Sequence, residues 1–126
     1  MSLGYIGYFK KFDEDNTSAM YLYSGSNWND LNNDKEAEMA YDGEILISKS
    51  VLSWGKSRQK SKHQTEFIHW TYKAIKEGHA KVNRPCKNAF YRGDMKFDYI
   101  ALHCLLRIFD AIYDKSSFPD NGGFIQ

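Results

Sequence analysis

The sequence predicts an α+β fold in which a small antiparallel sheet of about three strands, in the N-terminal half, packs against two longer C-terminal helices. Three observations lead to this prediction. Aromatic, β-prone runs separated by turn residues fill the first 48 residues. Apolar residues recur at helical spacing in the second half. The length of 126 residues fits one globular domain, residues 1–126, with a single core.

The predicted sheet is built from three runs. The runs "GYIGYFKKF" and "SAMYLY" flank the turn sequence "DEDN", and together they predict an antiparallel hairpin. The polar stretch "SGSNWNDLNND" is typical of a loop. Residues 34–41 allow a short helix, although 38–41 also allow a strand, and the turn at Asp42-Gly43 predicts a third strand over 44–48.

The first predicted helix begins at a capping-box pattern, with Ser61 followed three residues later by Gln64. Gly78 is expected to end this helix. Its apolar face is predicted from residues at helical spacing: Phe67, Ile68, Thr71, Ala74 and Ile75.

Residues 79–93 are predicted to form a connection to the last helix. Asp94 is the expected N-cap of that helix, which is predicted to run over about residues 95–115 and to be apolar on most sides. Residues 118–126 are predicted to be a loose tail unless the two phenylalanines within them dock onto the core.

The composition predicts a cytoplasmic protein that has no membrane segment and needs no cofactor. Two cysteines are too few for a disulfide scaffold, and the N-terminal residues do not resemble a signal peptide. The longest apolar run is too short to span a bilayer. Charge is unevenly distributed: residues 1–50 hold four Lys against nine acids, whereas 51–126 hold thirteen Lys or Arg against seven. Such asymmetry favours charged partners.

The tripeptide Gly55-Lys56-Ser57 follows an apolar run and precedes a helical pattern, which is the order of a phosphate-binding P-loop. That motif requires a glycine separated by four residues from the Gly-Lys-Ser, and Ser50 occupies this position. A P-loop also needs a parallel sheet and a later strand that ends in a Mg²⁺-binding Asp, and the sequence offers no such strand. We therefore interpret the segment as a strand, a loop and a basic helix start.

The histidines and cysteines do not predict a metal site, since no pair has the spacing of a known metal motif. Cys104 lies within the apolar helix, where a thiol behaves as a small hydrophobic group. Cys86 stands between Pro85 and Lys87, so nearby positive charge could lower its pKa and make it a nucleophile.

The favoured functional hypothesis is a non-catalytic inhibitor that binds a basic protein through an acidic, aromatic front. Clustered carboxylates steer a basic partner and aromatic side chains anchor it. Small inhibitors that neutralise basic toxins such as nucleases, including bacterial immunity proteins and antitoxins, use this physical strategy. The residues predicted for the front are Asp13, Glu14, Asp15, Tyr21, Tyr23, Trp28, Asp30, Asp34, Glu36 and Glu38.

Two alternatives stay open. The first is a nucleic-acid-binding accessory protein of phage or mobile-element type, in which basic residues contact phosphates and aromatic residues stack on bases. Its predicted residues are Trp54, Lys56, Arg58, Lys60, Lys62, Arg84, Lys87 and Arg92. The second is a small enzyme that uses either Cys86 or the polar stripe of the last helix, formed by His103, Arg107 and Asp110. The pattern favours a solvent-facing strip over a catalytic role for this stripe, because nearly every helix that packs on a sheet shows such a strip.

Overall fold

A computed structural model of the chain describes residues 4–56, 66–93 and 96–126. Five strands make one sheet, and their bounds are β1 Tyr5–Glu14, β2 Ser18–Asn27, β3 Gly43–Ser48, β4 Ala80–Arg84 and β5 Asn121–Ile125. The helical elements are the short turns η1 Lys35–Ala37 and η2 Lys49–Val51 and the α-helices α1 Leu52–Lys56, α2 Glu66–Glu77 and α3 Tyr99–Lys115.

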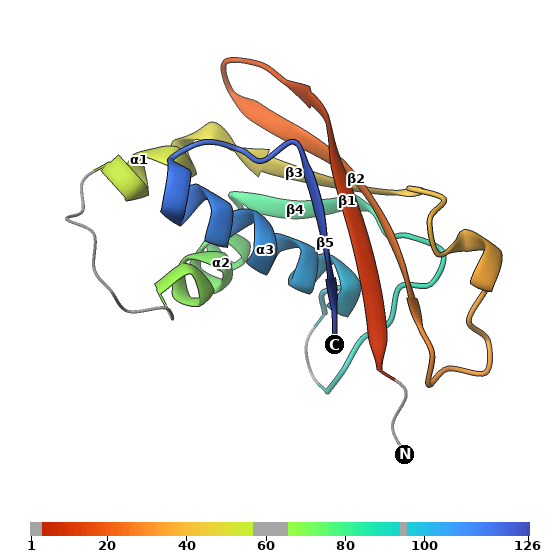
Figure 1. Cartoon of the computed structure of the whole chain (residues 1–126). Coiled ribbons are helices and arrows are strands. Elements are labelled where there is room, and N and C mark those ends of the chain that lie inside the picture. The colour runs from red at the N-terminus through yellow and green to blue at the C-terminus, as the bar shows by residue number, and fades with distance from the viewer. Residues whose placement is uncertain (1–3, 57–65, 94–95) are drawn as a thin grey trace.

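The sheet is antiparallel in all four pairings and has the order β4-β3-β2-β1-β5. Strands β1, β2 and β3 form a meander, while β4 and β5 occupy the two edges. The helices α2 and α3 lie together against one face of the sheet (Figure 1). An antiparallel sheet can keep its other face toward solvent, and this arrangement leaves no parallel β–loop–α unit for a phosphate-binding loop after β3.

The predicted fold class is wrong in both of its counts, because the sheet has five strands and the C-terminal half has one long helix with a shorter one. The sequence "AKVNR" of β4 contains a single β-branched residue, and "NGGFI" of β5 contains two glycines. Neither segment shows the periodic apolar pattern by which a strand is recognised. Both become strands because a neighbouring strand supplies the pairing that their own propensity does not favour.

The segment 118–126, expected to be loose unless its phenylalanines docked, forms the edge strand β5. Phe118 and Phe124 are both buried in the core. The backbone pairs antiparallel with β1, so Gly7 lies opposite Phe124 and Phe9 opposite Gly122. At Gly7 a side chain would collide with the Phe124 ring, which explains a residue without Cβ at this crossing.

The start of α3 differs from the predicted one, whereas α2 ends at Gly78 as predicted. Asp98 caps α3, since its carboxylate accepts hydrogen bonds from the backbone N–H groups of Ile100 and Ala101. The predicted cap Asp94 and the capping box Ser61–Gln64 lie outside the described residues. Helix α2 ends at Glu77 and is followed by Gly78, whose positive φ of 81° suits a helix terminus.

The core lies between the sheet and α3. Most sides of α3 are buried, as its apolar sequence indicates, and Tyr21 and Tyr23 of β2 are fully buried beneath it. This core contains a buried hydrogen-bond network around Asp98, which is 1% exposed. Its carboxylate accepts hydrogen bonds from the Tyr23 hydroxyl at 2.6 Å and the Phe90 N–H at 3.1 Å, besides those from the helix. These bonds fix the connection before α3 against the sheet.

Within the described ranges, none of the helices combines the length and the apolar character that crossing a bilayer requires.

Candidate functional site

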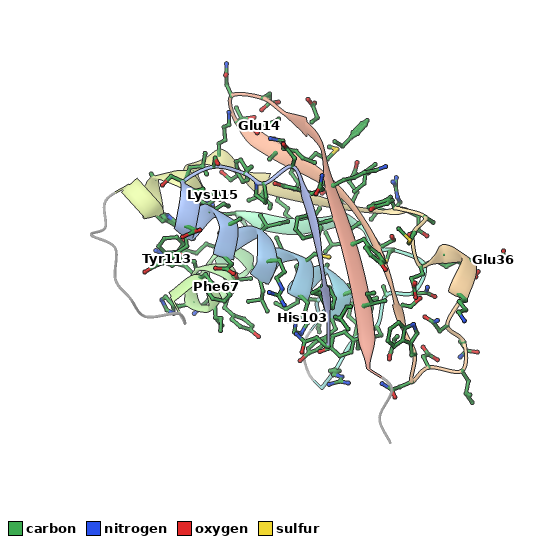
Figure 2. The ribbon with its side chains drawn as sticks, in the orientation of Figure 1. Glu14, Glu36, Phe67, His103, Tyr113 and Lys115 are labelled. Atoms are coloured by element: carbon green, nitrogen blue, oxygen red, sulfur yellow. The ribbon has the colours of Figure 1, made fainter. Side chains whose placement is uncertain are left out.

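The acidic residues of the predicted front occupy two separate places. Asp13, Glu14 and Asp15 lie at the turn between β1 and β2, whereas Asp30, Asp34, Glu36 and Glu38 lie in the connection between β2 and β3. Ten residues of β2 separate the two places, which corresponds to roughly 30 Å at the usual rise of a strand. Figure 2 shows Glu14 and Glu36 at distant ends of the molecule. The predicted single face is therefore two surfaces.

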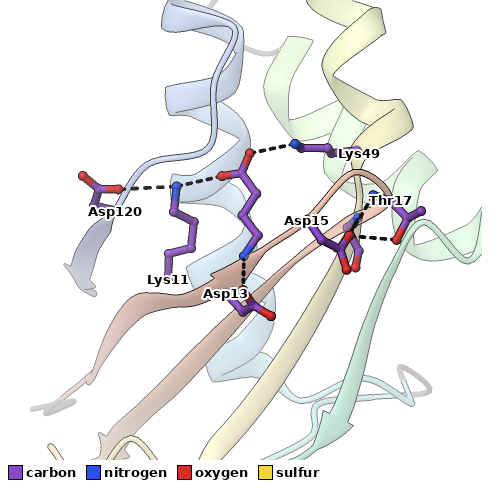
Figure 3. A network of polar contacts seen from close by, with 8 residues as sticks. Lys11, Asp13, Asp15, Thr17, Lys49 and Asp120 are labelled. Atoms are coloured by element: carbon purple, nitrogen blue, oxygen red, sulfur yellow. Dashed lines mark hydrogen bonds and ion pairs between the residues drawn. The ribbon is translucent and has the colours of Figure 1, made fainter.

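The carboxylates at the hairpin turn are engaged in local structure (Figure 3). Asp15 accepts hydrogen bonds from the N–H groups of Thr17 and Ser18 and from the Thr17 hydroxyl, and these bonds lower its pKa. Glu14 forms ion pairs with Lys11 at 2.8 Å and Lys49 at 3.1 Å. The hydrogen bond from Lys11 is the main cause of the lowered pKa of Glu14. In this turn Glu14 is paired with two lysines, whereas Asp13 and Asp15 accept hydrogen bonds from the local backbone and keep their negative charge.

The connection between β2 and β3, residues 28–42, carries five acids and one lysine, a net charge of −4. We call it the acidic connection. Its backbone is held by Asn88, whose side-chain amide accepts from the Asp34 N–H at 2.7 Å and donates to the carbonyl oxygens of Asp34 and Gly25. Lys87 adds an ion pair to Asp34 at 2.6 Å. The pKa of Asp34 is lowered, chiefly by this contact with Lys87.

The acidic connection also lies against the sheet. The Ser24 hydroxyl donates a 2.9 Å hydrogen bond to the Glu38 carbonyl oxygen, and Ala37 is buried. The Lys10 ammonium group lies 4.3 Å from the centre of the Tyr41 ring. These contacts hold the backbone of the connection against the sheet.

Three large apolar side chains project from the acidic connection into solvent. Leu31 is 102% exposed, Met39 59% and Trp28 37%. The Trp28 indole donates a 3.1 Å hydrogen bond to a Glu38 carboxylate oxygen. A hollow of about 490 Å³ lies beside the indole and is lined by Trp28, Asp30, Asn33, Lys35 and Glu38. Carboxylates and exposed apolar side chains therefore lie on the same connection.

The sequence did not identify Leu31 and Met39 as part of a binding surface. A signal was present for Leu31, because it is a large apolar residue inside the predicted polar loop, where no periodic pattern turns it toward a core. Met39 lies in the stretch for which a short helix or a strand was left open, so its exposure had no such signal. Exposed apolar residues that gather in one place, unlike single scattered ones, mark interaction sites.

Tyr21 and Tyr23 do not belong to any exposed surface. Both side chains are 0% exposed, and their hydroxyl groups donate to the Pro119 carbonyl oxygen and to Asp98. Burial raises the pKa of both phenols. They are core residues, and we remove them from the predicted binding front.

The described basic residues of the nucleic-acid alternative all make internal contacts. The Arg84 side chain donates to the Asp42 carbonyl oxygen, and Lys87 pairs with Asp34. The Arg92 guanidinium lies over the rings of Tyr5, Phe90 and Tyr99 at 5.0–5.8 Å. Trp54 is half-buried against Trp70 and Phe109. The Lys56 side chain and the residues Arg58, Lys60 and Lys62 lie outside the described part of the chain.

The residues of the polar stripe of α3 differ in exposure. Arg107 and Asp110 are exposed, whereas His103 is half-buried among aromatic rings. Its Nε2 is 3.1 Å from the Tyr5 hydroxyl and its Nδ1 is 3.4 Å from the Gln126 amide. Burial, with help from Arg107 and Arg92, lowers the pKa of His103. Both ring nitrogens thus have partners within the fold.

Cys86 lies in the buried hydrogen-bond network around Asp98, with its thiol 3.8 Å from Asp98 Oδ2. Burial and the negative charge of Asp98 raise the pKa of the Cys86 thiol. A nucleophilic cysteine needs the opposite shift, because the thiolate is the reactive form. Cys86 is therefore a structural residue in this fold.

No group of three or more His, Cys, Asp or Glu side chains among residues 4–56, 66–93 and 96–126 is placed to hold a metal ion. No protein-family model, no curated protein and no solved structure matches the chain. The acidic connection is an exposed surface that combines a net negative charge with large apolar side chains.

Proposed function

We propose that this protein is a small non-catalytic binding protein that captures a basic protein through its acidic connection. Its most concrete form is an immunity- or antitoxin-type inhibitor that neutralises a toxin domain such as a nuclease. The observation that carries the proposal is the coincidence of net negative charge with three exposed apolar side chains, Trp28, Leu31 and Met39, on one fixed segment.

The negative charge and the exposed apolar side chains of the acidic connection have different roles in association. Carboxylates such as Asp30 and Glu36 raise the rate of encounter with a basic partner and disfavour acidic ones. Leu31 and Trp28 supply apolar area, and the hollow beside the Trp28 indole can receive a side chain from the partner. Because the Asn88 bonds hold the backbone in place, little conformational entropy is lost on binding.

The proposed compartment is the cytoplasm, where a nuclease finds its substrate. Both cysteines are free and buried, which fits a reducing environment.

The test is reversal of charge on the acidic connection in the triple variant Asp30→Lys/Glu36→Lys/Glu38→Lys. The partner is isolated by affinity purification with the wild-type protein, sequenced, and expressed alone and together with each variant. We expect a basic partner that stops growth when it is expressed alone. The wild-type protein should restore growth, and the triple variant should fail to do so.

The matched control is Glu77→Lys/Asp110→Lys/Asp114→Lys, which reverses three exposed carboxylates on α2 and α3 and leaves the acidic connection intact. This variant should restore growth as the wild type does. Equal rescue by the triple variant would show that the acidic connection is not the binding surface.

A further inference from the structure

The free edge of β4 borders a groove on the side of the molecule that carries the helices. The strand pairs with β3 on one side, and no strand among residues 4–56, 66–93 and 96–126 pairs with its other side. The groove holds about 380 Å³, and its lining includes the apolar residues Ile75, Ala80, Val82, Pro85, Tyr91 and Phe97. These residues come from α2, from β4 and from the segments on either side of Gly93, so the groove runs between three parts of the fold.

The backbone of β4 directs hydrogen-bonding groups into the free edge. The Ser48 N–H donates to the His79 carbonyl oxygen at 2.7 Å, which makes Ser48 and His79 a hydrogen-bonded pair. In an antiparallel ladder such pairs alternate with pairs whose backbone groups point away from each other. Leu46 and Lys81 are then the next hydrogen-bonded pair, and the backbone groups of Ala80 and Val82 point away from β3.

The same residues Ala80 and Val82 line the groove with their side chains. A strand added along this edge would direct every second side chain to the same side, toward Ile75 and Phe97. The exposed Tyr91 ring, 54% exposed, stands at the rim and offers further apolar surface.

The charge beside the groove is positive. Lys81 and Lys96 are both exposed and both line it. Asp98 also contributes to the lining, but its carboxylate is buried and accepts hydrogen bonds from Tyr23 and from three backbone N–H groups. The two lysines therefore face solvent with their charges available to a ligand.

We propose that the β4 edge binds an extended, acidic segment of a partner protein as a sixth strand, with alternate apolar side chains in the groove. The main-chain bonds come from Ala80 and Val82, and Lys81 and Lys96 pair with the acidic side chains of the segment. Strand addition at a free sheet edge obtains affinity from main-chain hydrogen bonds and specificity from pockets for alternate side chains.

This inference is independent of the proposed inhibitor function. The acidic connection selects a basic surface and uses residues 28–42, whereas the β4 edge selects an acidic segment and uses none of them. Failure of either proposal leaves the other standing.

The test uses a synthetic peptide of about eight residues in which Glu and Val alternate, a length that matches a common strand. A Lys-Val peptide of equal length and a single-stranded thymidine oligonucleotide serve as comparison probes. Binding is followed by fluorescence anisotropy at low salt and by amide hydrogen exchange in the wild-type protein. We expect the Glu-Val peptide to bind, and to slow exchange at the Ala80 and Val82 N–H groups.

Two variants separate the contributions. Lys81→Glu/Lys96→Glu should weaken binding of the Glu-Val peptide by about tenfold or more, as loss of about 1.4 kcal/mol implies. The control Arg107→Glu/Lys115→Glu has the same change in net charge at exposed basic residues of α3 that do not line the groove, and it should bind as the wild type does. Val82→Pro removes an outward N–H that does not bond to β3, so it should abolish binding while the circular dichroism spectrum stays that of the folded protein.

Several results would overturn the proposal: equal binding of the Lys-Val peptide, unchanged exchange at Ala80 and Val82 when the Glu-Val peptide is saturating, or binding of the oligonucleotide alone. If Val82→Pro fails to fold, the exchange measurement on the wild type decides the matter.

Discussion

The Tyr23 hydroxyl donates a 2.6 Å hydrogen bond to Asp98 Oδ2 and accepts one from the Cys86 N–H at 3.2 Å. One phenol therefore joins β2 to the cap of α3 and to the segment after β4. All three residues are buried. Buried polar groups that lose a partner cost more than the bond itself contributes.

Tyr23→Phe should consequently destabilise the fold by about 1–3 kcal/mol, because it leaves the Cys86 N–H without its partner and Asp98 with one donor fewer. Urea unfolding, analysed at constant m-value, measures this change. The control is Tyr72→Phe on α2, since Tyr72 is 46% exposed and its substitution should change stability by less than about 0.5 kcal/mol. Equal unfolding free energies for the two variants would contradict the assigned role of Tyr23.

Phe124→Ala should be among the most damaging changes in β5, at about 3–5 kcal/mol, because it opens a cavity between β5 and α3. The neighbouring Ile125→Ala removes an apolar side chain that is 68% exposed and should cost far less. Thermal unfolding of the pair tests whether residues 121–125 are packed as an edge strand. A loose C-terminal segment would make the two variants indistinguishable from the wild type.

Glu14→Gln should alter the response of the fold to acid. Lys11 and Lys49 lower the pKa of Glu14, so its contribution to stability is complete above about pH 4.5 and is lost as the pH falls through the lower folded-state value. The variant should be less stable than the wild type at pH 7, and the gap should close as the pH falls below 4.5. Lys49→Met should reproduce part of the loss at pH 7. A gap that stays constant from pH 7 to pH 2 would refute this role of the Glu14 ion pairs.

His103 should destabilise the fold when it is protonated. Burial and the charges of Arg107 and Arg92 lower its pKa, and the aromatic groups Tyr5 and Tyr99 also face it. Its neutral form therefore contributes stability that is complete above about pH 6.5 and is lost as the pH falls toward the lower folded-state pKa.

His103→Gln should remove this pH-dependent part of the unfolding free energy between pH 7 and pH 5, and an NMR titration of the wild-type imidazole should give a pKa below 6.5. An imidazole that titrates above this value would contradict the burial argument.

Leu31→Ala separates binding from folding, under the proposed inhibitor function. The side chain is fully exposed, so its loss should change the unfolding free energy by less than about 0.5 kcal/mol. Binding to the isolated basic partner should weaken by more than about 1 kcal/mol if Leu31 is an anchor. Calorimetric titration measures the second quantity, and unchanged affinity would exclude Leu31 from the interface.

The parts of the fold that the sequence predicted are those with local signals. The hairpin at "DEDN", the third strand and the long apolar helix each have a turn, a period or a cap of their own. Strands β4 and β5 have no such signal, and they exist because β3 and β1 offer them an edge. Pairing between distant segments is invisible to a local pattern.

The prediction of the candidate site was limited in the same way, because it too depended on local sequence. Charge can be counted along the chain, so Asp30, Glu36 and Glu38 were predicted as part of one acidic segment, and the structure places all three in the connection between β2 and β3. The burial of a side chain cannot be counted in this way. Tyr21 and Tyr23 were therefore predicted on a surface, although β2 directs both side chains into the core. The separation of Asp13 from Asp30 depends on β2 being one continuous strand, which the sequence run "SAMYLY" understated.

Because β1 pairs with β5, the strands are expected to join the sheet in a particular order during folding. Tyr5 and Gln126 exchange two backbone hydrogen bonds, at 3.2 and 2.9 Å, across nearly the full length of the chain. The meander of β1, β2 and β3 closes through short loops, whereas β5 can join only after a very long one has closed. We therefore expect β5 to dock late in folding, and to be the first strand to detach when the protein opens locally.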